Sequence, residues 1–219
     1  MKTRMRILVV TIVLVLLVAG GARMQAQSTS LGVVGGINVA TLSVEDPQGL
    51  DIGTRFGVNF GARLSATFTP NFGVILGALY SQKGMSSTDA GVTVGFHFNY
   101  IDFPLLVQYT LPTSETGKMS VHFAAGPAVG LRATCKITGE QSGSSVSVDC
   151  ADIGADVKSV DMGVMALAGL DIQAGSGSVI VDVAYDLGLT NINSTSDGGS
   201  IKNRNLYVMA GYQIPLGSR

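Results

Sequence analysis

The chain has little of the material from which soluble surfaces and metal sites are built. Only 13% of its 219 residues are charged, about half the usual share of a globular domain. It has no tryptophan, two cysteines and two histidines, which leaves little for a Cys/His metal site. No cluster of Lys and Arg occurs beyond the N-terminus and the formal net charge is -1, which excludes a strongly basic nucleic-acid binder. No cofactor and no metal are expected.

Apolar residues and glycine are plentiful by contrast. The apolar fraction is 46% and 29 residues are glycine. An intrinsically disordered chain is poor in apolar residues, so disorder is excluded. The length suits one domain or two small ones.

The first 26 residues have the pattern of a secretory signal peptide. Lys2, Arg4 and Arg6 precede the apolar run 7–18, and small residues follow up to Ala26. Twelve apolar residues span about 18 Å as a helix, too little to cross a bilayer core of about 30 Å. We expect cleavage after Ala26, so that residues 27–219 form the mature domain. An uncleaved N-terminal anchor is the alternative.

The mature chain alternates apolar and small or polar residues, which is the period of a β-strand. Eight such stretches are predicted, at 31–42, 53–69, 72–84, 92–111, 118–132, 159–173, 177–190 and 204–216. Several are long enough to cross a bilayer as tilted strands. No stretch of residues 27–219 approaches 18 uninterrupted apolar residues, so we expect no transmembrane helix in the mature chain.

The connections between these stretches alternate in length. Short turns are predicted at 69–71, 112–117 and 175–177, and longer links at 43–52, 85–91, 133–158 and 191–203. Bacterial outer-membrane barrels sort their connections in this way, with short periplasmic turns and long extracellular loops. The pattern predicts an all-β, eight-stranded, antiparallel up-and-down transmembrane barrel with its termini in the periplasm. In lipid such a barrel must close, so the first strand should pair with the eighth.

The side chains on the second face of each strand are too small and too rarely charged to form a solvated exterior. We therefore assign the Val, Leu and Phe face to lipid and the Gly-rich face to the lumen, where charges can pair. The predicted luminal ion-pair network consists of Arg55, Arg63, Asp102, His122, Arg132, Asp161, Asp171, Asp182 and Asp186. His97 is also expected to face the lumen.

Cys135 and Cys150 fall in the same predicted extracellular loop. An exported protein sits in an oxidising compartment, so we expect a disulfide between them. Closing a loop of about 15 residues removes roughly 3 kcal/mol of unfolded-state freedom. Two free thiols are the alternative.

The segment Asn99–Tyr109, with Asp102 and Pro104 in its centre, resembles a hallmark of the PorT-like outer-membrane β-barrel family. Gly126-Pro127, the stretch with Gly163 and Gly169, and the ending 211–214 also resemble that family. The resemblance covers about residues 30–216 and implies barrel architecture and an outer-membrane location more than any activity. It would allow an accessory part in a secretion apparatus. The chain lacks the C-terminal aromatic that the barrel-assembly machinery reads in many such proteins.

Two arrangements could carry chemistry. His122 with a hydroxyl such as Ser120 and an acid would make a lipid-hydrolysing triad, but a luminal histidine bonded to an acid is the favoured interpretation. Asp182 and Asp186 lie about 13 Å apart along one strand face, too far to act on one bond. We therefore expect no catalytic residues.

The sequence predicts a non-enzymatic bacterial outer-membrane protein with a structural or surface-interaction role, not a wide pore. Its partners would be outer-membrane lipid, the barrel-assembly machinery during biogenesis, and a protein meeting loops 133–158 and 191–203. An outer-membrane lipid-modifying enzyme and a soluble lipocalin-like periplasmic carrier are the alternatives.

Overall fold

The structure, a computed structural model, describes residues 28–45, 52–89, 91–113, 118–155, 157–194 and 199–217. The predicted signal peptide and its cleavage site lie outside these ranges. The described elements are β1 Ser28–Val44, β2 Arg55–Thr67, β3 Phe72–Asp89, β4 Val92–Pro112, β5 Met119–Gln141, β6 Ser144–Asp149, the short 3-10 helix η1 Cys150–Ile153, β7 Val160–Ala174, β8 Gly177–Gly188 and β9 Ile201–Pro215. No helix among the described residues is long and apolar enough to cross a membrane.

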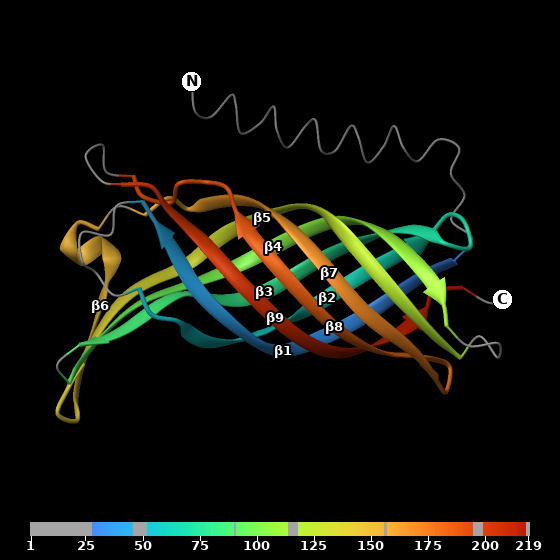
Figure 1. The fold of residues 1–219 in the computed structure, drawn as a ribbon, viewed down its shortest axis with the longest axis horizontal. Coiled ribbons are helices and arrows are strands. Elements are labelled where there is room, and N and C mark those ends of the chain that lie inside the picture. The colour runs from blue at the N-terminus through green and yellow to red at the C-terminus, as the bar shows by residue number, and fades with distance from the viewer. Residues whose placement is uncertain are drawn as a thin grey trace, which may run out of the picture.

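Eight of the strands form a closed antiparallel ring (Figure 1). Each of β1 to β5 pairs with the next strand, β5 then pairs with β7, and the ring continues through β8 to β9. The closing pair joins β1 to β9, from Ser30 opposite Pro215 to Val44 opposite Ile201. Closure gives backbone N–H and C=O groups partners without help from water. The predicted eight-stranded up-and-down barrel is confirmed, including the pairing of its first and last strands.

The two ends of the barrel differ. At the turn end, β1 begins, β9 ends, and short turns join β2 to β3 and β7 to β8; β6 and η1 lie at the opposite, loop end (Figure 1). β5 continues to Gln141 and forms a hairpin with β6 through pairs from Lys136–Asp149 to Gln141–Ser144. The prediction of a loop over residues 133–158 is therefore wrong for much of that range. The segment 144–149 is short and rich in serine, and its pairing depends on lying next to β5.

The predicted long link 85–91 is also wrong. β3 runs to Asp89 and β4 starts at Val92, and the two strands pair up to the contact of Asp89 with Val92. Ser86, Ser87 and Thr88, which fall in the predicted link, continue the ladder opposite β4. One connection at the loop end is thus as tight as a turn, so the lengths do not alternate strictly.

The apolar face of the strands points outward, as predicted. Phe56 is 75% exposed, Phe123 49% and Val183 47%, whereas Asp182 between Val181 and Val183 is 1% exposed. Two aromatic pairs add to this outer wall, Phe60 with Tyr80 and Phe72 with Tyr109, at centroid distances of 5.0 and 4.9 Å. A soluble barrel places its apolar side chains inside. This surface instead matches hydrocarbon, where apolar side chains need no water.

Side chains fill the lumen in layers. An apolar layer occupies the middle and consists of Val34, Ile75, Leu79, Leu106, Ala124, Ala128, Met165, Leu167, Ile180, Ala184, Tyr207 and Met209. A second apolar group caps the loop end and consists of Leu42, Met85, Phe98, Tyr100, Cys135, Cys150 and Ile192. Polar side chains lie between and below these layers. The interior is therefore a packed core, as expected of a narrow eight-stranded barrel.

Candidate functional site

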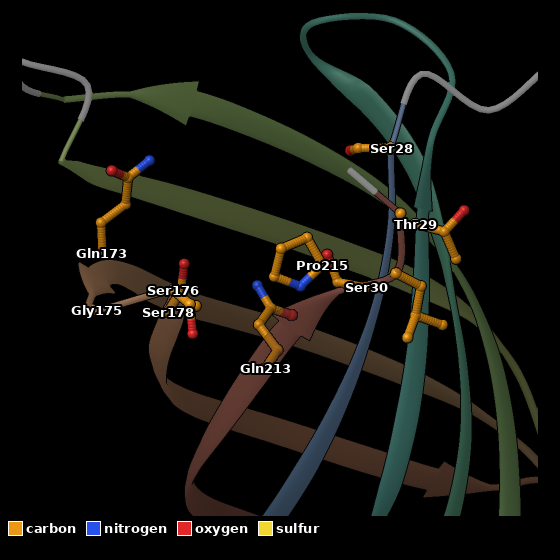
Figure 2. Close-up of a pocket in the computed structure, with 12 residues that line it drawn as sticks. Ser28, Thr29, Ser30, Gln173, Gly175, Ser176, Ser178, Gln213 and Pro215 are labelled. Carbon is orange, nitrogen blue, oxygen red and sulfur yellow. The ribbon is translucent and has the colours of Figure 1, made fainter. Parts of the chain in front are cut away.

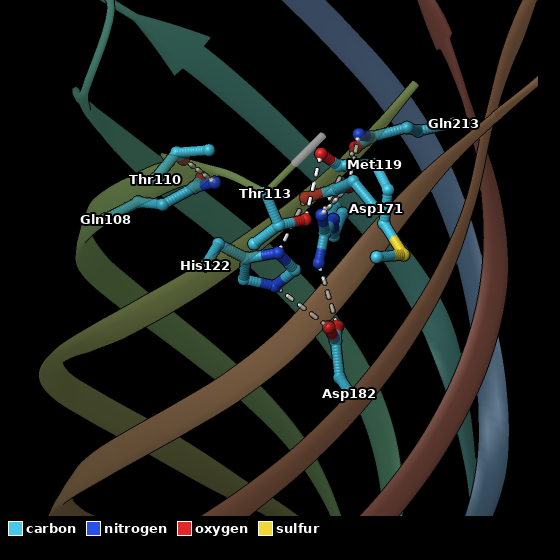
Figure 3. Close-up of polar contacts among 9 residues, drawn as sticks. Gln108, Thr110, Thr113, Met119, His122, Asp171, Asp182 and Gln213 are labelled. Carbon is cyan, nitrogen blue, oxygen red and sulfur yellow. Dashed lines mark hydrogen bonds and ion pairs between the residues drawn. The ribbon is translucent and has the colours of Figure 1, made fainter. Parts of the chain in front are cut away.

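Five side chains near the turn end form a closed ring of polar contacts, here called the His122 cluster (Figure 3). His122 is flanked by two carboxylates: its Nδ1 lies 2.6 Å from Asp171 and its Nε2 lies 2.9 Å from Asp182. Arg63 lies 2.8 Å from the second oxygen of Asp182 and donates to Gln213 at 3.2 Å. Gln213 in turn donates to Asp171 at 2.9 Å. Since the members come from β2, β5, β7, β8 and β9, the ring ties distant walls of the barrel together.

Gly169 makes the room for this cluster. A Cβ atom at Gly169 would lie 2.1 Å from Oδ1 of Asp182 and 2.6 Å from Nε2 of His122. Both distances are below any real Cβ contact. The small residues that the sequence places on the luminal face thus provide the space in which the luminal charges meet.

A second set of charges, here called the Lys83 cluster, lies nearer the loop end. The Lys83 ammonium is 2.9 Å from Asp102 and 2.7 Å from Asp186, and all three side chains are at most 4% exposed. It also lies 5.1 Å from the centre of the Tyr100 ring. Lys83 was not among the predicted network members. The signal was present, because Lys83 falls on the inward face of β3 with Leu79 and Ser81.

The other predicted network members occupy different positions. Arg55 donates to the backbone carbonyl of Lys83, and Arg132 donates to those of Val157 and Lys158. Within the described part of the chain neither guanidinium takes part in an ion pair. The prediction that Arg55 and Arg132 pair with luminal acids was therefore wrong. Both guanidinium groups thus bind main-chain carbonyl oxygens and not luminal acids. Asp161 accepts a hydrogen bond from Asn203 at 2.8 Å.

His97 is not luminal, and its predicted placement was wrong. Phe98 and Tyr100 face inward on β4, so His97 lies on the opposite face, where its Nε2 is 3.3 Å from the Thr138 hydroxyl. The reason is that the loop-end part of β4 carries aromatic residues inward, where they form part of the apolar cap. The sequence had suggested that such residues face lipid.

The predicted disulfide joins Cys135 of β5 to Cys150 at the start of η1, with a Cα–Cα distance of 5.5 Å. Both residues are buried in the apolar cap with Phe98 and Ile192. The bond therefore anchors η1 and the end of β6 onto the top of the barrel.

The turn end opens into a polar vestibule of about 440 Å³ (Figure 2). Most of its walls are hydroxyl, amide and glycine residues, among them Ser30, Gln173, Ser178 and Gln213, and Pro215 and Leu216 complete the lining. Gln213 belongs also to the His122 cluster, so the vestibule ends at that cluster. A void of about 20 Å³ follows, lined by Arg63 and Asp182 of the cluster and by members of the apolar layer. It has room for about one water molecule. The apolar layer thus separates the vestibule from the loop end.

The geometry leaves little catalytic capacity in the His122 cluster. Both ring nitrogens of His122 contact carboxylates, so neither is directed at a hydroxyl nucleophile, which a hydrolytic triad requires. Among the described residues, no three His, Cys, Asp or Glu side chains are arranged to hold a metal ion. The arrangement fits a structural role in which the two acids and Arg63 cross-link the barrel.

A closed eight-stranded barrel with an apolar outer wall and a charged, filled lumen is an outer-membrane β-barrel. Residues 25–194 match the family model described as outer membrane protein beta-barrel domain. The chain belongs to this family and its location is the outer membrane. No curated protein is significantly similar to the chain.

Several solved structures are similar to the chain. Ail, the attachment invasion locus protein of Yersinia pestis, is 15% identical over 86% of this chain and 100% of that one, with a TM-score of 0.43. Neisserial surface protein A is 12% identical over 84% and 96%, with a TM-score of 0.48. OprG of Pseudomonas aeruginosa is 13% identical over 87% and 98%, with a TM-score of 0.43. Similarity this distant carries no argument about function.

Proposed function

We propose that this protein is a PorT-like outer-membrane barrel that acts non-enzymatically as a surface-interaction protein, with its loop end outside the cell and its termini in the periplasm. All connections at the turn end, after β2, β4 and β7, are short, whereas at the loop end those after β1 and β8 are long, the one from β5 to β7 contains β6 and η1, and the one after β3 is short. This sorting supports the orientation, because outer-membrane barrels keep short turns on the periplasmic side. The segment Asn99–Tyr109, which resembles the PorT-like hallmark, lies in β4.

The protruding sheet at the loop end is the observation that carries the proposal. β3, β4 and β5 are 18, 21 and 23 residues long, well beyond the 13 residues of β2. β6 extends this sheet and pairs only with β5 among the described strands. No described strand pairs with its other edge, to which an extended segment of a partner can add as a further strand.

The two loops that the sequence singles out as partner sites form one surface. Val157 and Asn193 make an isolated antiparallel bridge, and the backbone N–H of Lys158 donates to the carbonyl of Ile192 at 2.8 Å. Val146 and Ile153 are 64% and 54% exposed on the β6–η1 side. The disulfide holds this region in place before a partner arrives, which lowers the entropic cost of binding.

The lipid-modifying enzyme, the alternative from the sequence, needs a histidine free to activate a nucleophile. The two carboxylates on His122 argue against it. The lipocalin-like carrier needs an apolar ligand cavity and a polar exterior, and the apolar outer wall argues against that. Outer-membrane lipid and the barrel-assembly machinery remain the partners we propose for insertion.

Photo-crosslinking in whole cells tests the proposal. A photoreactive residue placed at exposed Val146 should form protein adducts from outside the cell, whereas the same residue at lipid-facing Val183 should not. External protease should cut residues 142–159 while β1 to β4 stay in the membrane fraction. Adducts at both positions alike, or loops protected in whole cells and cut only after the outer membrane is opened, would refute the proposed role and orientation.

A further inference from the structure

β6 is the outermost strand of the protruding sheet at the loop end (Figure 1). Among the described strands it pairs only with β5, in an unbroken register. The two-residue turn that joins them, Ser142-Gly143, has positive φ at both positions, 49° and 82°, as a type I′ hairpin turn requires. This turn holds one end of β6, and the disulfide at Cys150 holds the other. The outer edge of β6 is therefore ordered before any partner arrives.

This edge lacks the features that keep exposed strands apart. Natural sheets protect their edges with lysine, proline or a β-bulge. The segment 144–149 contains neither lysine nor proline, and its ladder with β5 has no register shift. Its single charge, Asp149, is on its last residue. The edge is thus open to a further strand.

The two faces of β6 differ in polarity. Val148 lies opposite Ile137, which packs against the apolar cap, so the face with Val146 and Val148 continues that cap. Val146 is 64% exposed, since the residue opposite it is Gly139, which offers no side chain to cover it. The residues on the other face are Ser145, Ser147 and Asp149. An added strand must therefore alternate apolar and polar residues in the same way.

β6 itself meets this requirement. We propose that β6 pairs with β6 of a second copy of this chain, in an antiparallel ladder centred on Ser147; this inference rests on the proposed surface-interaction role. Residues directly opposite each other in such a ladder share a face. The centre on Ser147 sets each Val146 against Val148 of the second copy, and each Asp149 against the hydroxyl of Ser145 and not against another carboxylate. No other centre within β6 sets both valines against valines. The contact is isologous, because both copies use the same residues.

Cysteine crosslinking of the full chain in the outer membrane tests this register. Directly opposite residues of an antiparallel pair have Cα atoms about 4.5–5.5 Å apart, within the range of about 4.4–6.8 Å that a disulfide spans. Ser147→Cys should therefore give a disulfide-linked dimer under oxidising conditions. Ser145→Cys is the matched control on the same face, and it should stay monomeric because its two sites lie four residues apart, about 13 Å. Since Cys135 and Cys150 are already joined, the new thiol has no partner within its own chain.

Val146→Lys places a charge against a valine of the second copy, so it should abolish the link in the Ser147→Cys background. Its unfolding midpoint should not change, because Val146 is exposed. A monomeric Ser147→Cys, or equal dimer yields from Ser147→Cys and Ser145→Cys, would overturn the self-pairing.

The photo-crosslink at Val146 separates this inference from the proposed function. An adduct with twice the mass of the chain supports self-pairing. Adducts with other proteins alone uphold the surface-interaction role and overturn the self-pairing. The absence of any adduct overturns both.

Discussion

Removal of the Lys83 ammonium tests whether the luminal charges hold the barrel together. In Lys83→Met, Asp102 and Asp186 lose a partner at 2.9 and 2.7 Å while both stay at most 4% exposed. Removing one member of a buried ion pair costs about 3–5 kcal/mol, because the remaining charge is left uncompensated. We expect a loss of that size in the free energy of unfolding. The methionine has nearly the same length, so little of the loss comes from packing.

Denaturant unfolding of the protein in lipid vesicles, followed by circular dichroism, measures this loss, since the chain has no tryptophan to report it. Lys136→Met is the matched control, because Lys136 is exposed on β5. Adding Asp102→Asn and Asp186→Asn to Lys83→Met should restore part of the stability, since no buried charge is then unpaired. A Lys83→Met variant within about 1 kcal/mol of the control, the worth of a surface ion pair, would show that the reasoning is wrong.

Three further predictions follow from the same contacts. Gly169→Ala should destabilise the barrel by about 1–3 kcal/mol through overpacking against Asp182, whereas Gly139→Ala, where a Cβ meets nothing within 4 Å, should not; equal unfolding midpoints would contradict this. Cys135→Ser with Cys150→Ser should lower the stability by roughly 3 kcal/mol and speed proteolysis of the loop end, and cleavage at the wild-type rate would count against it. Planar-bilayer recordings should show no sustained conductance, because the apolar layer fills the lumen; a steady open state would refute a sealed core.

The alternation of the sequence predicted the barrel and its outward face correctly, because a strand places successive side chains on opposite sides. In β8, this alternation alone predicts that Val181 and Val183 lie on the outer surface and that Asp182 faces the lumen. The closing pair also followed, because a membrane leaves no strand edge unpaired. The cysteines were predicted to pair because the exported chain contains only two.

The alternation cannot say which luminal charges meet. The network was predicted with Arg55 and Arg132 as pairing members, yet both bind carbonyl oxygens, and Lys83 is the cation that joins Asp102 to Asp186. Which strands face each other across the lumen depends on the register and tilt of every strand in the ring. That information is distributed over eight pairings and is absent from any single segment.

The sequence by itself determined the period of two, the apolar wall, the closed ring and the location in a membrane, because each follows from short-range alternation and from the need to satisfy backbone groups in lipid. Only the tertiary structure decided that residues 144–149 form a strand, that Asp89 meets Val92 in a tight turn, and that His122 lies between two aspartates. These features depend on contacts between segments far apart in the chain, where packing and register outweigh local preference.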